Sequence, residues 1–313
     1  MMKIKFWGVR GSIPCPGPHT MKYGGNGACM ELRVEGRKEI IVIDAGSGIR
    51  ELGNSLMKND LPNGPLEMSL YLSHTHWDHI MGFPYFVPIY IPGSKLKVMG
   101  PVSFEDDPLK DVVGGQMKYR YFPINVGELA ADIEYGRLRE EPDKDLGGGL
   151  LLTTKLINHP ITALGYRFEH QGKVFCTCYD HEPYRNLFIT DPEHPEYDEG
   201  MAYEGEEVAK EQNQAIEDFF KDADVLVHDS QYTEEEYDPS DPKKPKKINW
   251  GHSTFEHAIA AANRAGVKKL VLFHHDPDRS DDQIDKLAKI YCEPGKYGDT
   301  EVVFAVEGSE ITL

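Results

Sequence analysis

Residues 74–79, HTHWDH, carry three histidines and one aspartate, with only two other residues between them. Imidazole and carboxylate together suit zinc, manganese or iron when several of them converge. The run follows the apolar segment 68–72, which is typical of a buried strand, so these side chains stand where a strand ends and a loop begins. A solvated polar loop is the alternative, but it does not account for four ligand-type residues in six positions. The spacing predicts ligands for two ions, with His74 and His76 on one and Asp78 and His79 on the other.

Such a cluster cannot complete two coordination spheres alone, so further ligands are needed at other strand ends. Three positions qualify: His159 after the strand-like segment 150–157, Asp180 after 173–178, and His274 at the end of 269–273. His275, next to His274, remains an alternative ligand. The closely spaced Cys176 and Cys178 are interpreted as small buried strand residues rather than ligands.

The composition limits the classes of partner. The chain of 313 residues has 34 basic and 52 acidic residues and a net charge of −18, which argues against broad attraction to a nucleic-acid backbone. Five scattered cysteines are not typical of a disulfide framework, so we expect reduced thiols. The start lacks the apolar core of a signal peptide, and no stretch approaches the roughly 18 apolar residues of a membrane helix. We therefore expect a cytoplasmic protein without a membrane segment.

The elements that must position the ligands follow from hydrophobic periodicity. Strands are predicted first, and from residue 206 onward helices alternate with strands, which favours sheets packed together with helices outside them. The looser segment 104–149 ends in three consecutive glycines and is predicted to be an insertion in a single domain, 1–313. Predicted strands are 3–7, 29–34, 39–43, 150–157, 163–168, 173–178, a short one within 222–231, and 269–273, and predicted helices are 206–220, 253–266 and 280–291.

At these residues the chain resembles the metallo-β-lactamase superfamily, and within it the RNase Z-like phosphodiesterase branch. The resemblance covers nearly the whole chain. HTHWDH is similar to the superfamily signature, and IDAGSG to the strand and turn before it, whose aspartate, here Asp44, supports the ligand loop. The segments NHPITALGYRF, VFCTCYDHE and LVLFHH resemble those that carry the third histidine, the bridging aspartate and the last histidine. The resemblance implies an α/β fold, an αββα sandwich of two mixed β-sheets flanked by helices.

The resemblance also implies two divalent metal ions, zinc or manganese, and favours His274 over His275 as the last ligand. The ions would activate a water molecule for in-line attack on phosphorus. The implied division places His74, His76 and His159 on the first ion and Asp78, His79 and His274 on the second, with Asp180 bridging.

Two further segments resemble loops that mark the phosphodiesterase branch, HDSQ at 228–231 and HST at 252–254. The match implies that Asp229 orients His252, which meets the phosphate and protonates the leaving group, and Asp78 is counted with them as catalytic. Independently, the residues 253–256 form a predicted capping box, which would place His252 at a helix N-terminus that favours anions. In the alternative reading, His252 is a polar residue that merely precedes a cap.

Only 21 residues separate His159 from Asp180, which leaves no room for the long basic arm with which transfer-RNA-processing members grip RNA. The resemblance therefore points to small cyclic phosphodiesters, with 3′,5′-cyclic nucleotides opened to linear monophosphates, rather than to a large nucleic acid. An RNase Z-like nuclease, a lactone or thioester hydrolase and a non-enzymatic binding module are the alternatives.

Three further features remain open. By analogy with such proteins, we expect a homodimer in which the segment 104–149 reaches across. The basic run 242–247 is either a contact for phosphate or a solvated loop. The aromatic residues near the ligand loop are interpreted as core residues, with an aromatic wall for a base as the alternative; they are Trp77, Phe83, Tyr85, Phe86 and Tyr90.

Overall fold

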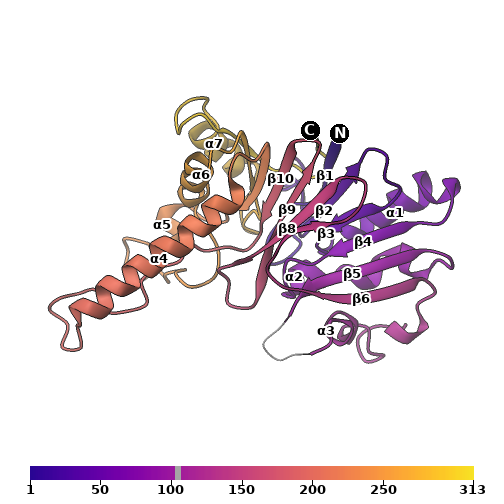
Figure 1. The fold of residues 1–313 in the computed structure, drawn as a ribbon, viewed down its shortest axis with the longest axis horizontal. Helices are drawn as coiled ribbons and strands as arrows, with labels where there is room; N and C mark the ends of the chain where they lie inside the picture. The colour runs from indigo at the N-terminus through magenta and orange to yellow at the C-terminus, as the bar shows by residue number, and fades with distance from the viewer. Residues whose placement is uncertain (103–106) are drawn as a thin grey trace.

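The computed structural model describes residues 1–102 and 107–313. Within them the chain forms two mixed sheets of seven strands each, packed face to face with helices on both outer sides (Figure 1). This is the predicted αββα sandwich, and the prediction is confirmed.

The first sheet has the strand order β14-β1-β2-β3-β4-β5-β6. Its strands pair antiparallel from β14 to β3 and parallel from β3 to β6. The bounds are β1 Met2–Gly8, β2 Cys29–Val34, β3 Ile40–Ile43, β4 Glu67–Tyr71, β5 Lys95–Pro101, β6 Asp132–Leu138 and β14 Glu310–Thr312.

The second sheet repeats this pattern, with the order β13-β12-β11-β10-β9-β8-β7. It is parallel from β13 to β10 and antiparallel from β10 to β7. The bounds are β7 Glu141–Asp145, β8 Leu150–Ile157, β9 Ala163–His170, β10 Lys173–Cys178, β11 Val225–Asp229, β12 Lys269–Phe273 and β13 Glu301–Phe304.

Three apolar layers hold the sandwich together. Alternate side chains of both sheets, such as Ile4, Phe168 and Phe175, form the central layer. The first sheet packs its outer face on α1 (Ile49–Asn59), α2 (Trp77–Ile80) and α3 (Leu109–Gly115). The second sheet packs on α4 (Glu199–Phe220), α6 (Phe255–Arg264) and α7 (Asp281–Tyr291), while α5 (Glu234–Tyr237) is a single turn. Burial of these faces is the main driving force for the fold.

The carboxyl ends of the parallel strands provide the place for a site. Polar residues follow β3, β4, β10 and β12, and β11 ends in one. Asp44, Asp180 and His274 lie there with positive φ angles of 60°, 43° and 63°. The left-handed region is costly for residues with a side chain, and such strain concentrates at functional sites.

The expected insertion, 104–149, lies partly outside the described residues, which exclude 103–106. Its described remainder is joined to the sandwich: β6 pairs with β5, β7 pairs with β8, and α3 packs below the first sheet. The segment therefore supplies one edge strand to each sheet.

A second segment projects from the body. The loop after β10 and the long helix α4 extend away from the second sheet (Figure 1). Residues 183–220 carry eleven Asp and Glu but only two basic residues, Arg185 and Lys210. Among the described residues, no helix combines the length and the apolar character needed to cross a membrane.

Candidate metal centre and active site

The structure brings all seven predicted metal ligands together at the carboxyl edge of the two sheets. Their ligand atoms form two groups, and within each group all atoms lie within 4.8 Å of one another. Asp180 belongs to both groups. The first group contains His74, His76, His159 and Asp180, and the second contains Asp78, His79, Asp180 and His274.

The first group is built from three segments. His74 lies at the end of β4, and its Nε2 atom is 3.5 Å from Oδ2 of Asp180. His76 Nδ1 lies 2.9 Å from Nε2 of His159, which is itself 3.9 Å from the same carboxylate oxygen. Three imidazoles and one carboxylate oxygen therefore point at one small volume.

The second group has a higher density of negative charge. His79 Nε2 lies 3.2 Å from Oδ1 of Asp180 and 3.3 Å from Oδ2 of Asp78. His274 Nε2 lies 3.2 Å from each of these two oxygens. The backbone N–H of Ser12 donates to Asp78 Oδ2 at 2.8 Å and so fixes the carboxylate.

Behind the ligand loop, Asp44 performs the supporting role that the resemblance implied. Its side chain accepts hydrogen bonds from the backbone N–H and the hydroxyl of Ser73, at 2.6 and 2.7 Å. It also lies 2.7 Å from Nδ1 of His79. Such a contact sets the ring orientation and leaves Nε2 toward the centre. Ser73 was not singled out in the sequence, although its place between β4 and the first histidine is a usable signal.

The donor set fits divalent metal. His74 Nε2 and Asp180 Oδ1 are buried and have no hydrogen-bond partner, which is costly for polar atoms unless something else binds them. Both atoms point into the two groups. Imidazole nitrogen and carboxylate oxygen are the donors that zinc, manganese and iron accept.

The electrostatics of the two groups differ. Burial lowers the pKa of His74 well below its usual value and that of His159 to about 4, so both rings are neutral and able to act as ligands. Burial opposes the charged form of His79 as well, but Asp180, Asp78 and Asp44 raise its pKa well above the usual value. These three carboxylates therefore give the second group a negative charge that a bound cation would balance.

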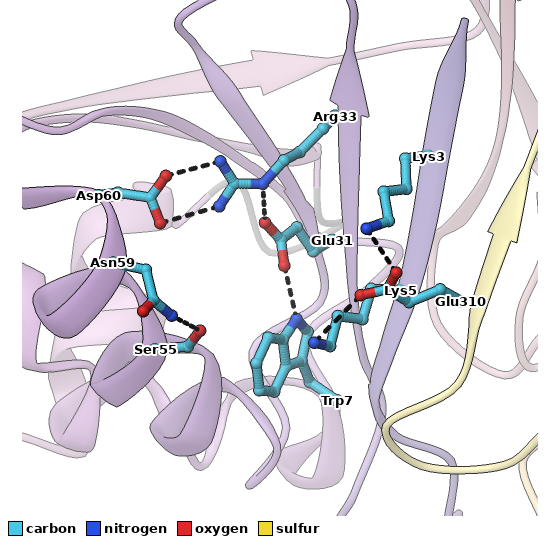
Figure 2. Close-up of a pocket in the computed structure, with 9 residues that line it drawn as sticks. All are labelled: Lys3, Lys5, Trp7, Glu31, Arg33, Ser55, Asn59, Asp60 and Glu310. Atoms are coloured by element: carbon cyan, nitrogen blue, oxygen red, sulfur yellow. Dashed lines mark hydrogen bonds and ion pairs between the residues drawn. The ribbon is translucent and has the colours of Figure 1, made fainter. Parts of the chain in front are cut away.

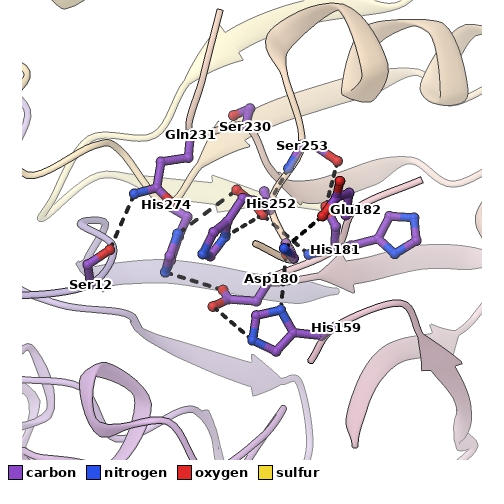
Figure 3. Close-up of polar contacts among 12 residues, drawn as sticks. Ser12, His159, Asp180, His181, Glu182, Ser230, Gln231, His252, Ser253 and His274 are labelled. Atoms are coloured by element: carbon purple, nitrogen blue, oxygen red, sulfur yellow. Dashed lines mark hydrogen bonds and ion pairs between the residues drawn. The ribbon is translucent and has the colours of Figure 1, made fainter. Parts of the chain in front are cut away.

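His252, in the loop before α6, lies beside Asp180, His159 and His274 (Figure 3). Its Nδ1 lies 2.9 Å from Oδ2 of Asp229, and its ring stacks on His274 with centroids 5.0 Å apart. Burial works against protonation of His252, but Asp229 outweighs it and raises the pKa to about 9. Because Asp229 engages Nδ1, Nε2 is the nitrogen left for a substrate.

The predicted capping box is one residue out of register. Thr254, not Ser253, is the N-cap of α6, and its side chain accepts from the backbone N–H of His257. The Ser253 hydroxyl instead donates to the carbonyl of His181 at 2.6 Å. His252 therefore stands two residues before the cap.

The loop before His252 is held by a residue that sequence reasoning missed. Glu182 is buried and accepts from the backbone N–H groups of Asn249 and Gly251, each at 2.8 Å, and from the hydroxyl of Tyr237. The Gly251 carbonyl in turn lies 3.0 Å from Nδ1 of His159. One carboxylate thus supports both His252 and a predicted ligand (Figure 3). The signal in the sequence was a Glu two residues after Asp180.

Gly251 also has a steric role. Its φ is 86°, and a Cβ there would stand 2.2 Å from Nδ1 of His159. Only glycine fits both requirements. This close approach lets the loop carry His252 up to the ligand rings.

Other histidines fall outside the two groups. His275 is buried, donates from Nε2 to the carbonyl of Ala305 at 2.9 Å, and lies against Tyr23 and Phe304. His181 and His170 are also buried, and His257 is partly buried; none of the three belongs to either ligand group. Of the aromatic residues near the ligand loop, Phe83 and Phe86 lie in the core, as the favoured interpretation had it, whereas Trp77 and Tyr85 are exposed.

Comparison with known proteins finds relatives that match most of the chain. No protein-family profile matches the chain. The chain is 28% identical over 308 residues to a Ribonuclease Z of Thermoplasma volcanium, covering 90% of this chain and 89% of that protein. A Ribonuclease Z of Nitrosopumilus maritimus is 26% identical over 311 residues, covering 91% and 93%.

Solved structures show the same fold. The metallo-β-lactamase fold protein YhfI of Bacillus subtilis aligns with a TM-score of 0.61 at 15% identity, over 100% of both chains. A diphosphatase of the PhnP family aligns at 0.62 and 15% identity, over 100% of this chain and 98% of that one. The short form of human tRNase Z aligns at 0.59 and 19% identity, over 99% and 98%.

Fold and site together define a metal-dependent hydrolase with the metallo-β-lactamase fold. Within that class, the resemblance to the RNase Z-like branch is confirmed, because the curated relatives are ribonucleases Z that match almost the whole chain.

Proposed function

We propose that the protein hydrolyses small cyclic phosphodiesters, with 3′,5′-cyclic nucleotides as substrates and linear monophosphates as products, at a centre of two divalent ions. The coarser class, a metal-dependent phosphodiesterase, is supported by the ribonuclease Z relatives. The Asp229–His252 pair beside the two ligand groups supports phosphodiester chemistry, and the observation that carries the choice of a small substrate is the interval of only 21 residues from His159 to Asp180.

The proposed ligands are His74, His76 and His159 for one ion and Asp78, His79 and His274 for the other, with Asp180 shared. When bound, such ions supply Lewis acidity toward the phosphoryl group and an activated water. The chain's own contribution is to orient the donors: Asp44 engages Nδ1 of His79, the Ser73 hydroxyl lies 3.0 Å from Nδ1 of His74, and the backbone N–H of Ser12 holds Asp78. This orientation is what separates a catalytic site from a set of loosely placed ligands.

His252 would supply the proton that the leaving oxygen needs. Water adds to phosphorus, the bond from phosphorus to the ester oxygen breaks, and Nε2 of His252 gives its proton to that oxygen. The proton that the water loses restores the imidazolium. Asp229 keeps Nδ1 engaged throughout and stabilises the charged ring.

The acidic character of the chain favours a small substrate over a polyanion: the net charge is −18, and the projecting segment 183–220 is acidic. A polyanion would be repelled by this segment. The interval from His159 to Asp180 holds only β9, β10 and their connections. In the basic run, Lys247 lies 3.9 Å above the ring of Tyr232, which contacts His252, whereas Lys246 pairs with Asp238. Of these two lysines, Lys247 is therefore the one beside a neighbour of His252, and its Nζ also lies 3.9 Å from Oδ2 of Asp276.

RNA processing is the second candidate, because the relatives carry the name Ribonuclease Z over 88–94% of this chain. The two candidates share the metal centre and the proton donor and differ in what lies outside them. A nuclease of this branch would need contacts for an RNA backbone beyond the scissile phosphate.

The test is to incubate zinc- or manganese-loaded protein with cyclic AMP, cyclic GMP, cyclic CMP and cyclic UMP, and separately with a precursor transfer RNA, and to separate the products. Asp180→Ala protein serves as the control for contaminating activity. We expect ring opening of at least one cyclic nucleotide and no cut in the RNA. Cleavage of the RNA with every cyclic nucleotide intact would replace the proposal by the second candidate.

A further inference from the structure

Two surface cavities differ in what they leave available to a ligand. The cavity of about 230 Å³ beside β1 and α1 is lined by charged side chains that already bond to one another (Figure 2). Glu310 forms ion pairs with Lys3 and Lys5. Arg33 forms ion pairs with Glu31 and Asp60. Since these charges are mutually satisfied, this cavity has little with which to select a charged ligand.

The second cavity, of about 580 Å³, lies between α2 and α3 and has a different character. Its volume falls in the range of small-molecule sites. It is lined mostly by aromatic and apolar side chains, among them Trp77, Met81, Tyr85, Tyr121 and Phe122.

Three of these rings are unusually open to solvent. Trp77 is 72% exposed, Tyr85 56% and Tyr121 71%. Their neighbours Phe83 and Phe86 are fully buried, so the same segment could have packed its aromatic side chains inward. Tyr85 is held edge-on by Phe122, with centroids 5.4 Å apart. A gathering of exposed rings around one hollow marks a binding surface rather than a scatter of surface residues.

The cavity and the ligand groups share one stretch of the chain. Trp77 stands between His76 and Asp78, so the residue that lines the cavity is flanked by two predicted ligands. The short helix α2 carries both this ring and the ligand-type residues Asp78 and His79, so one element joins the cavity wall to the ligand groups.

The cavity also has one polar side chain in its wall, Gln116, and unfilled space beside Gly115. The Gln116 side chain donates from Nε2 to the carbonyl of Ile80 at 2.8 Å, which fixes the amide at the wall. Gly115 is a helical residue of the lining, and a Cβ added to it would meet no atom within 4 Å. Space for a planar ring is therefore present next to a hydrogen-bonding group.

We propose that this cavity binds the nucleobase of the substrate, with Trp77 and the two tyrosines as stacking surfaces and Gln116 as an edge contact. The proposal rests on the proposed function, since a base is present only if the substrate is a nucleotide. Aromatic rings stack on any base, so the cavity would give affinity with limited base selectivity.

The experiment compares two ligands that differ only in the base. Isothermal titration calorimetry of the zinc-loaded full chain measures the dissociation constants of adenosine 5′-monophosphate and ribose 5-phosphate. Stacking of one base corresponds to a preference of about 5- to 150-fold for the nucleotide. Gly115→Leu fills the cavity, and Trp77→Ala removes its main ring. In both variants we expect the ratio of the two dissociation constants to fall toward one.

Gly127→Leu is the matched control. It adds the same side chain to an exposed glycine of the same segment, outside the cavity lining, where a Cβ makes only an ordinary contact with Asn125. The preference should survive in this variant. Equal affinities in the wild type, or a preference that persists in Gly115→Leu, would overturn the proposal.

Two further outcomes separate this proposal from others. If Gly115→Leu and Trp77→Ala turn a dimer into a monomer in sedimentation velocity while the preference persists, the surface is an interface between two copies, and the base site is refuted. If the preference behaves as expected but no phosphodiester is hydrolysed, the base site stands and the proposed function fails. Hydrolysis of bis-p-nitrophenyl phosphate without any preference is the reverse case.

Discussion

Among the described residues, the ligand groups around Asp180 lie close to a second cluster that shares no residue with them, and the hydrogen-bond pattern of a metal site is found in the groups around Asp180. The ligand groups around Asp180 combine imidazoles with carboxylates and leave buried donor atoms without partners. Behind them, Cys178, His181 and His228 also bring their ligand atoms within 4.8 Å of one another. Distance alone would rank the two clusters alike.

The protonation states of the side chains distinguish the two clusters. The backbone N–H of Asn158 donates to Nδ1 of His181 at 3.1 Å, so the neutral ring carries its proton on Nε2 and cannot bind metal there. Burial lowers the pKa of His181 and His228 and raises that of the Cys178 thiol well above its usual value. The second cluster is thus a neutral, hydrogen-bonded set without a carboxylate. A metal site needs deprotonated donors and negative charge as well as proximity.

The largest expected effect comes from removing the carboxylate that the two ligand groups share. Asp180→Ala should lose both bound metal and activity, since one side chain serves both groups. Metal analysis by mass spectrometry, with turnover of bis-p-nitrophenyl phosphate, measures the two together. The wild type should hold two divalent ions per chain, and an active wild type with at most one ion would refute the dinuclear centre.

His252→Ala should separate binding from proton transfer. Because His252 lies outside the two ligand groups, metal content should stay at the wild-type level while turnover of an alkyl phosphodiester falls by about 10²- to 10⁴-fold. The loss should be much smaller for a p-nitrophenyl ester, whose leaving group needs no proton. Equal losses for both esters would show that His252 contacts phosphate without donating a proton.

Much of this arrangement was predictable from sequence because its signals are local. The alternation of apolar residues predicted β2, β8 and β12 to within a residue or two, and HTHWDH carried a ligand loop in six residues. Strand ends then suggested His159, Asp180 and His274. Periodicity and motif spacing both act over a few neighbouring residues, which is why they survive without a structure.

The remainder depends on contacts between distant segments. Nothing near Glu182 indicates that it will accept from Asn249 and Gly251, 67 and 69 residues away. Helix α4 begins at Glu199 rather than at 206, since its first turns project from the body and bury few apolar side chains that would produce a periodic pattern. The shifted capping box has a similar origin, because the Ser253 hydroxyl is taken by the carbonyl of His181.

Glu182→Gln should have a smaller effect than loss of His252 itself. An amide keeps the shape but replaces one acceptor by a donor, so one of the N–H groups of the 249–251 loop or the Tyr237 hydroxyl loses its partner. Loss of a hydrogen bond to a charged group corresponds to about 1.5–3 kcal/mol of stability. If the loop positions His252, the loss of turnover should be greater for an alkyl ester than for a p-nitrophenyl ester.

The matched control is Glu217→Gln, which weakens another buried carboxylate, bonded to Arg264 on the far side of the second sheet. It should lower the melting temperature without any leaving-group dependence. A defect in Glu182→Gln that is the same for both esters would reduce Glu182 to a purely structural role.

The histidines behind the metal centre should make the protein acid-sensitive. Burial lowers the pKa of His257 to about 4, against about 6.5 in an unfolded chain. Between these values the unfolded state binds the proton and the folded state does not, so stability is full above pH 6.5 and is lost as the pH falls toward 4. In EDTA, the melting temperature should drop more steeply between pH 7 and pH 5 for the wild type than for His257→Gln; parallel curves would contradict the shift.

The smallest expected effect tests the comparison most directly. Cys178→Ala removes the only sulfur of the second cluster, and the bound metal per chain should remain that of the wild type, because no thiolate is present to bind an ion. Stability should fall by about 1 kcal/mol through the small cavity that is left. Measuring the bound metal per chain in Cys178→Ala and in Asp180→Ala side by side tests both clusters in one experiment. If Cys178→Ala lost metal while Asp180→Ala kept it, the two clusters would exchange roles, and the hydrogen-bond argument that separates them would be wrong.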